Sequence, residues 1–314
     1  MPEGPEVRNI ADQLNKLIEY EKFKITIDQI ELSKNAEVID FDFFTEMQPT
    51  TPFRVTKIYS YGKKLIIELN SIFSIIFSLG MTGAIRLEKT LHSHLTFTYN
   101  VHREMNGASA KGIYTICHET DAASAAETKK FYFHDSRRFG DVRFLKSAKI
   151  ADIKAIYDLG PDLLDHAINT HLSNKEWLAI FLRIGSSPTA IKNKTLAIGK
   201  RTISTILLDQ SFVAGIGNYL KSEILYYSAI LPDRLAADIT RDEWETLRVV
   251  SHHIIEVAHS YGGLTIESFI NPDGSMGTYP RAVYGKTEDP LGNKVYSSKT
   301  KDGRKSFWVP EIQF

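Results

Sequence analysis

The spacing of apolar residues along the chain changes twice. Within residues 5–19 apolar side chains recur at helical spacing, at Val7, Ile10, Leu14 and Leu17. This predicts one amphipathic helix. From residue 23 to residue 143 short runs alternate between apolar and polar positions, which predicts an antiparallel β-sandwich or barrel of about eight strands.

After residue 146 the pattern becomes helical. We expect helices at 149–158, 173–184, 199–208, 217–228 and 240–260, which are separated by segments that contain Gly or Pro. Residues 278–314 return to short strands with turns. The chain is therefore expected to be α+β, with an N-terminal antiparallel β-sandwich flanked by helices, then a helical domain, then a β-hairpin. We place these domains at 1–146, 147–270 and 271–314, and 101–130 reads as an inserted hairpin in the first domain.

Composition excludes several classes of protein. The chain is 43% hydrophobic with 17 Phe and 14 Tyr, too apolar for a disordered protein. No apolar run approaches the ~18 residues that a membrane helix needs. The start of the sequence is acidic where a signal peptide is basic and then apolar. We therefore expect an intracellular protein, in the nucleus or the cytoplasm.

The cysteine count and the charge distribution exclude or favour further classes of protein. The single cysteine, Cys117, allows neither an internal disulfide nor a Cys-rich zinc site. Basic and acidic residues balance at 38 each, but residues 1–52 hold 5 Lys or Arg against 11 Asp or Glu, and 183–201 hold five basic residues and no acid. Basic zones in the C-terminal half suit a phosphate backbone; the alternative is ordinary solvated surface charge.

Seven motifs in order carry a resemblance that spans nearly the whole chain. They are MPEGPEV, YGKKLIIEL, SLGMTG, HDSRRFGDVRF, LGPDLL, LLDQSFVAGIGNYLKSEILY and DGRKSFWVPEIQ. In this respect the sequence resembles the formamidopyrimidine/endonuclease VIII family of DNA glycosylases. The resemblance implies an N-terminal β-sandwich, a helix-two-turns-helix DNA-binding domain and a C-terminal hairpin that is usually a zinc finger.

The first motif holds the residues to which the resemblance assigns the chemistry. Once Met1 is removed, Pro2 presents a secondary amine that titrates near ~8, well below a lysine. Such an amine can attack C1′ of a damaged nucleotide and form an iminium. The resemblance makes Glu3 the general acid and gives Glu6 an orienting role. Without it, Pro2 would be an ordinary residue after the initiator and Glu6 a favourable charge in a first helical turn.

A lysine completes the implied catalytic group. The resemblance assigns it to Lys63, at the start of the LIIEL strand, which is expected to reach both the catalytic amine and a phosphate. Lys64 is the competing choice, and as its neighbour on a strand it should point to the opposite face. A solvated edge-strand lysine is the plain alternative for either residue.

The resemblance implies that side chains on two Gly-bounded turns fill the gap in the duplex that remains when a damaged base is flipped out. The residues are Met81 in SLGMTG and Arg137 and Phe139 in the RRFG turn, with Arg138 able to exchange roles with Arg137. An apolar and a planar cationic side chain on tight turns suit this task. Taken singly, Met81 and Phe139 would each more often be core residues, and it is their joint presence in two such turns that favours the functional role.

Two further positions are expected to contact phosphates. Asn218 stands at the start of a helix whose exposed N–H groups would form a phosphate site, although it could equally be a helix cap. Arg304 matches the arginine with which the family's finger grips phosphates, and its plain alternative is a surface charge beside a turn.

Three departures from the family pattern stand out. The finger's cysteine positions carry Pro290-Leu-Gly-Asn and Trp308-Val-Pro-Glu-Ile-Gln instead, so the chain resembles the zincless-finger members and we expect no metal. Ser78 stands where many members have a phosphate-contacting His. The segment 101–130 is longer than the usual connection.

The resemblance implies a bifunctional DNA repair glycosylase and abasic-site lyase that excises oxidised bases and nicks the strand by β,δ-elimination, without a cofactor. We expect damaged DNA as its partner and a monomer. Two alternatives remain: a catalytically silent protein of the same fold that binds damaged or structured DNA, and an N-terminal-amine enzyme acting on other carbonyl substrates. The sequence does not decide between 8-oxoguanine or formamidopyrimidines and oxidised pyrimidines or hydantoins.

Overall fold

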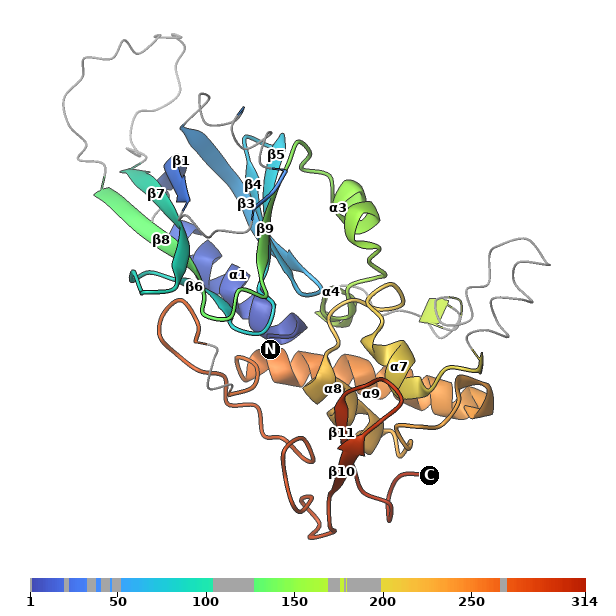
Figure 1. Ribbon diagram of the computed structural model, residues 1–314. Coiled ribbons are helices and arrows are strands. Elements are labelled where there is room, and N and C mark those ends of the chain that lie inside the picture. The colour runs from blue at the N-terminus through green and yellow to red at the C-terminus, as the bar shows by residue number, and fades with distance from the viewer. Residues whose placement is uncertain are drawn as a thin grey trace, which may run out of the picture.

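The computed structural model shows a β-rich part joined to a helical part (Figure 1). It describes residues 2–19, 23–32, 38–40, 46, 52–103, 127–168, 176–177, 179, 199–265 and 270–314. The tip of the expected insertion (104–126), most of the expected helix 173–184 and residues 183–198 of the basic stretch lie outside the described residues.

The first region is one helix and a sheet. Helix α1 covers Gly4–Glu19, in agreement with the expected amphipathic helix. The strands are β1 (Phe23–Leu32), β2 (Val38–Ile39), β3 (Phe53–Tyr61), β4 (Lys64–Leu69), β5 (Phe73–Ser78), β6 (Gly83–Arg86), β7 (Ser93–Arg103), β8 (Glu127–Asp135) and β9 (Asp141–Leu145).

The described strands form one nine-stranded sheet in the order β2-β9-β5-β4-β3-β1-β7-β8-β6. Only two residue pairs join β1 to β3, so the sheet bends there into two layers, visible in Figure 1. Apolar residues of both layers and of α1 share one core, for example Val7, Phe77 and Phe97. The expectation of a purely antiparallel sandwich needs one correction, because β2 pairs with β9 in parallel.

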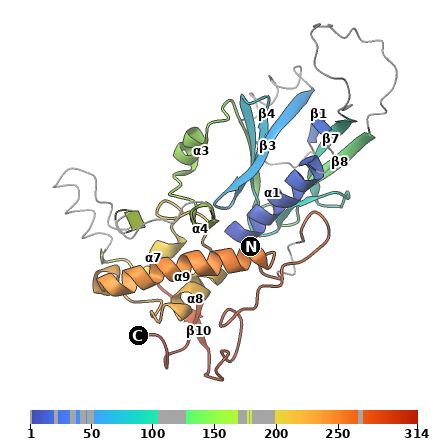
Figure 2. The ribbon, with the colours of Figure 1, turned by 180° about the vertical axis from the view of Figure 1, so that it is seen from behind.

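The helical part comprises α3 (Ile150–Tyr157), α4 (Leu163–Ile168), α7 (Ile203–Leu208), α8 (Asn218–Tyr227), the short 3₁₀ helix η2 (Ala236–Asp238) and α9 (Arg241–Ser260). A capping box between Thr240 and Glu243 starts α9. The pattern did not predict α4, and α7 begins later than expected because Thr202 caps it. Figure 2 shows α9 running along the back of this part, and its apolar face joins α8 in a second core.

The last region holds the hairpin of β10 (Tyr296–Lys299) and β11 (Lys305–Trp308). A small third core, which includes Val283 and Val309, lies beneath it. The Glu223 carboxylate of α8 accepts hydrogen bonds from three backbone N–H groups of this region, those of Ala282, Val283 and Tyr284, at 2.7–3.0 Å. Polar contacts to α8 therefore support this region directly.

None of the described helices combines the length and the hydropathy that a membrane span requires. No group of three or more His, Cys, Asp or Glu side chains among the described residues is placed to hold a metal ion.

Candidate active site

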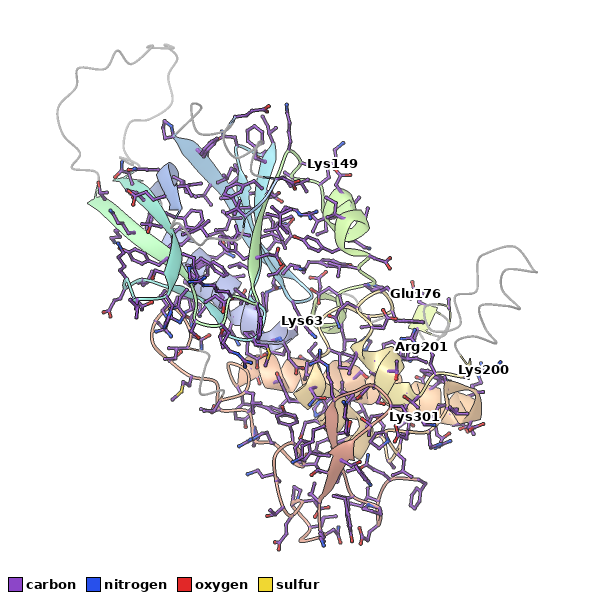
Figure 3. The ribbon with its side chains drawn as sticks, in the orientation of Figure 1. Lys63, Lys149, Glu176, Lys200, Arg201 and Lys301 are labelled. Atoms are coloured by element: carbon purple, nitrogen blue, oxygen red, sulfur yellow. The ribbon has the colours of Figure 1, made fainter. Side chains whose placement is uncertain are left out.

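Three chain segments meet where the sheet joins the helical part: the start of α1, the turn between β3 and β4, and the loop before α8. The Gly4 N–H donates to the Gly215 carbonyl at 2.9 Å. A Cβ added to Gly62 would stand 2.7 Å from the Ala214 Cβ, too close for any larger residue. Figure 3 shows Lys63 at this junction. Small residues therefore permit the close approach that assembles the site.

Glu3 is buried against the first turn of α8. Its carboxylate accepts hydrogen bonds from the backbone N–H groups of Gly217 at 2.6 Å, Tyr219 at 2.9 Å and Leu220 at 3.3 Å. Burial, assisted by the charge of Glu6, raises the pKa of Glu3 to about 7, although Lys63 and the hydrogen bonds from Tyr219 and Gly217 oppose the shift. A carboxyl group with this pKa can hold a proton near neutral pH and donate it.

Glu6 lies behind Glu3 and is fully buried. Oε2 accepts the Glu3 N–H at 2.7 Å, while Oε1 accepts the Tyr219 hydroxyl at 2.9 Å and the Leu264 N–H at 2.6 Å. Burial raises the pKa of Glu6 as well. Because Tyr219 also donates its N–H to Glu3, one residue of α8 is bonded to both carboxylates.

Lys63 lies in the turn before β4, one residue earlier than the strand on which we expected it. Burial lowers the pKa of Lys63 to about 8; the charge of Glu3 opposes this shift and that of Arg304 adds to it. Glu3 and Arg304 therefore lie near enough to influence the charge of Lys63. Lys64 has different neighbours, since its Nζ donates to Ser78 Oγ at 2.5 Å.

Pro2 lines a cavity of about 220 Å³ at this junction. The other lining residues are Lys63, Lys64, Ser78, Leu79, Gly80, Phe139, Leu159 and Gln210. The cavity brings together Pro2, the turn that carries Lys63 and the two turns expected to fill a duplex. The first residue after Met1 therefore shares a concave surface with groups from distant parts of the chain.

The two turns that carry Met81 and Phe139 are locked to each other. The Asp135 carboxylate accepts the N–H groups of Arg137 at 3.2 Å and Gly140 at 2.6 Å, and it also accepts the Thr82 hydroxyl. Gly80 has a φ of +58°, and a Cβ there would stand 2.5 Å from the Phe139 carbonyl. Only glycine fits this contact.

The expected duplex-filling residues lie on the surface of these turns. Met81 is 40% exposed and Phe139 is 56% exposed, so neither is the core residue that the plain alternative suggested. The Arg137 guanidinium is stacked 4.8 Å from the centre of the Phe139 ring. Arg138, the alternative to Arg137, is exposed and adopts a left-handed φ of 56°.

Asn218 begins α8, but the phosphate site expected from this helix end needs a correction. The N–H groups of Gly217, Tyr219 and Leu220 donate to Glu3, so they are not open to a phosphate. The Asn218 side chain instead donates through Nδ2 to the Lys305 carbonyl at 2.9 Å. Any phosphate contact at this helix end has to come from Asn218 itself.

Arg304 is exposed at the end of the β10–β11 turn. Its N–H donates to Asp302 Oδ1 at 2.7 Å, while Oδ2 of Asp302 lies 2.5 Å from Nζ of the buried Lys221 on α8. Lys221 also donates to Ser306 Oγ at 2.7 Å. Sequence reasoning missed Lys221; its only signal was a cation within the helical run YLKSEILY, whose other charged residue is Glu223.

Comparisons with known proteins point to one family. The family model described as the formamidopyrimidine-DNA glycosylase N-terminal domain matches residues 1–142, and the model for the H2TH domain of the same glycosylase matches residues 186–269. A formamidopyrimidine-DNA glycosylase of Listeria innocua is 28% identical over 325 residues, with 100% of both chains covered. One of Moorella thermoacetica is 28% identical over 292 residues, covering 92% of this chain and 90% of the relative.

Solved structures show the same fold. The MutM (Fpg) protein of Thermus thermophilus has a TM-score of 0.74 at 24% identity, covering 99% of this chain and 98% of the other. The Lactococcus lactis Fpg in complex with DNA that contains an abasic site has a TM-score of 0.74 at 22% identity, with 99% of both chains covered. The expected α+β fold with a helix-two-turns-helix domain is confirmed, and the chain belongs to the formamidopyrimidine/endonuclease VIII family of DNA glycosylases.

Proposed function

We propose that this protein is a bifunctional DNA glycosylase and abasic-site lyase that removes oxidised bases from DNA. The observation that carries the proposal is the cavity shared by Pro2 and Lys63, with the buried Glu3 carboxyl group beside Lys63. A terminal amine, a carboxyl group that can hold a proton and a lysine are the groups that this reaction needs in one place.

The proposed chemistry begins when Met1 is removed and Pro2 becomes the terminal residue. The neutral Pro2 nitrogen bonds to C1′ of the damaged nucleotide, and the base leaves with the electrons of the glycosidic bond. The proton released from the Pro2 nitrogen goes to the departing base. Glu3 gives its own proton to the ring oxygen O4′, the electrons of the bond from C1′ to O4′ stay on that oxygen, and an iminium forms between Pro2 and C1′. The iminium acidifies the C2′ proton, so successive β- and δ-eliminations cleave the strand on both sides.

The surrounding residues take supporting roles in this proposal. Glu6 orients the Glu3 backbone through its hydrogen bond, and Met81, Arg137 and Phe139 occupy the space left in the duplex. Asn218 and Arg304 contact phosphates of the damaged strand. We propose that a monomer acts, because one chain supplies all of these groups.

A catalytically silent DNA-binding protein of the same fold is the competing function. It would not need Pro2 to line a cavity or the Glu3 carboxyl group to be desolvated. The Lactococcus lactis Fpg has been solved with DNA containing Fapy-dG and with DNA containing an oxidised pyrimidine. Duplexes with each of these lesions, compared in one excision assay, would define the substrate range of this protein.

Borohydride trapping tests the proposed mechanism directly. Reduction of the iminium should join the protein covalently to DNA that contains a lesion or an abasic site, with Pro2 as the attached residue in the peptide map. A protein that retains Met1 is the matched control, since its Pro2 nitrogen is acylated. If that protein is trapped and cleaves DNA normally, the proline mechanism is wrong.

A further inference from the structure

The LGPDLL motif, which joins the sheet to the helical part, has no role in the chemistry proposed above. Its carboxylate, Asp162, is 3% exposed and comes directly before α4. Oδ1 of Asp162 accepts the N–H groups of Leu164 at 2.9 Å and Asp165 at 3.3 Å, which are the contacts of a helix N-cap. The cap uses one oxygen atom, so the second oxygen is available to another donor.

The second oxygen of Asp162 holds the turn that carries Lys63. Tyr61 and Lys64 are the last pair of the ladder between β3 and β4. Gly62 and Lys63 therefore form the two-residue turn that joins these strands. Oδ2 of Asp162 accepts the Gly62 N–H at 2.6 Å, although the two residues are 100 positions apart. Figure 1 shows α4 beside this end of the two strands.

The same linker is also fixed to the loop before α8. The Ala214 N–H donates to the Pro161 carbonyl at 2.8 Å, and the Leu163 N–H donates to the Ala214 carbonyl at 3.1 Å. Asp162 and Ala214 form an isolated parallel bridge. The end of this loop donates to the Glu3 carboxylate. Asp162 therefore lies between the turn of Lys63 and the backbone donors that hold Glu3.

Asp162 acts as a hydrogen-bond acceptor and not as a counter-charge. Its donors are all backbone N–H groups, and within the described ranges no cation forms a salt bridge with it. An asparagine side chain has one acceptor oxygen, and its NH₂ group would face an N–H donor. Asparagine at this position would therefore lose either the cap of α4 or the contact with Gly62.

We propose that Asp162 is a positioning residue for the reaction, which holds the turn of Lys63 in place relative to Glu3. The inference rests on the proposed function, since it takes Lys63 as a group that acts on the damaged nucleotide. Asp162 is not part of the cavity lining, so its effect on the reaction passes through Lys63. Displacement of a reacting group by about 1 Å can lower a rate by about 100-fold.

A double-mutant cycle tests this role. Single-turnover rates of base excision, with enzyme in excess over a lesion duplex, are measured for the wild type, Asp162→Asn, Lys63→Met and the double variant. Asp162→Asn should lower the rate about tenfold in the wild-type background. In the Lys63→Met background it should lower the rate less than about twofold, because the group that it positions is absent. Equal factors in the two backgrounds would overturn the proposal.

Asp162→Ser separates the cap of α4 from the contact with the turn. Serine can cap the helix with its single oxygen, but it has no second acceptor for the Gly62 N–H. This variant should therefore lose about the same tenfold in rate as Asp162→Asn. A wild-type rate in Asp162→Ser would show that the cap is the whole role of Asp162 and would overturn the proposal.

Asp289→Asn is the matched control. Asp289 is 6% exposed, and its Oδ1 accepts the N–H groups of Leu291 at 2.9 Å and Asn293 at 2.8 Å. Its Oδ2 accepts the Tyr226 hydroxyl at 3.0 Å, so both oxygens are used, as in Asp162. Whatever its size, the effect of Asp289→Asn should be the same factor with and without Lys63. A smaller factor in the Lys63→Met background here as well would overturn the specific role of Asp162.

Failure of this role is distinguishable from failure of the proposed function. Additive losses in an enzyme that borohydride still traps at Pro2 would refute the positioning role and leave the proline mechanism intact. Wild-type protein that binds the duplex but is never trapped would contradict the mechanism itself. Amide hydrogen exchange at Gly62 needs no activity. Asp162→Asn should speed this exchange about tenfold or more, and unchanged exchange would overturn the contact on which the proposal depends.

Discussion

Lys221 and Asp302 form a buried ion pair between helix α8 and the C-terminal hairpin. Lys221 Nζ lies 2.5 Å from Asp302 Oδ2, and the two side chains are 0% and 1% exposed. Their positions in sequence are 81 residues apart. The pair holds the turn that carries Arg304 against the helix that carries the backbone donors to Glu3, so it links the hairpin to the candidate active site.

Asp302→Asn should therefore destabilise the protein strongly. Asparagine can still accept the Arg304 N–H, but Lys221 would be left buried without its counter-charge, a loss of about 3 to 5 kcal/mol. Urea unfolding measures this loss. The double variant Lys221→Met and Asp302→Asn should recover most of it. Glu245→Gln, which breaks a more exposed pair with Arg248, should cost less than about 1 kcal/mol, and a similar small cost for Asp302→Asn would contradict the prediction.

Glu3→Gln should separate base removal from strand cleavage. An acid is needed mainly to open the sugar of an intact nucleoside, so base excision should fall by about 100-fold or more. Cleavage of a preformed abasic site should fall much less. Single-turnover rates on the two substrates measure the difference. Equal losses on both would count against Glu3 as the general acid.

The same substitution should change how stability depends on pH. The pKa of Glu3 rises from 4.5 to about 7 on folding, so between these pH values the folded protein binds a proton that the unfolded chain releases. This contribution makes the unfolding free energy of the wild type fall as pH rises, by at most about 1.4 kcal/mol per pH unit. Glu3→Gln lacks this contribution. The unfolding free energy of the variant should therefore rise relative to that of the wild type as the pH increases from 4.5 to 7. Parallel curves over this range would show that Glu3 titrates normally.

Gly80→Ala should impair lesion processing through the neighbouring turn. The new Cβ would stand 2.5 Å from the Phe139 carbonyl, so the Phe139 turn has to move. Excision from duplex DNA should fall by about 10- to 100-fold, as expected when a binding group is displaced by about 1 Å. Gly274→Ala is the control, because Gly274 also has a positive φ but no atom within 4 Å of an added Cβ. Equal effects of the two variants would assign the loss to backbone strain alone.

Arg304→Ala should weaken DNA binding with little effect on folding. Loss of one charge-assisted phosphate contact, worth about 1.5 to 3 kcal/mol, corresponds to roughly one to two powers of ten in affinity. The salt slope should decrease by about one. Lys301→Ala tests a second exposed cation of the same turn (Figure 3). If both variants lose affinity equally, the hairpin contributes only general positive charge and Arg304 has no specific contact.

Local features of the sequence determined much of this protein. Helix α1 and helix α9 were predicted because apolar spacing and capping act within a few residues. The β-rich, helical and hairpin order followed from the same periodicities. The seven motifs in order, among them those around Pro2, Met81 and Arg137, also carried the resemblance to the family.

Only the tertiary structure decided which distant groups meet. Glu3 accepts the Gly217 N–H from 214 residues away. The backbone N–H groups next to Asn218, which we expected to be free for a phosphate, therefore donate to Glu3 instead. The pairing of Lys221 with Asp302 and the contact of Lys64 with Ser78 were likewise invisible in the pattern. Periodicity reports which face of an element is buried, but the partner on that face depends on how elements far apart in the sequence pack together.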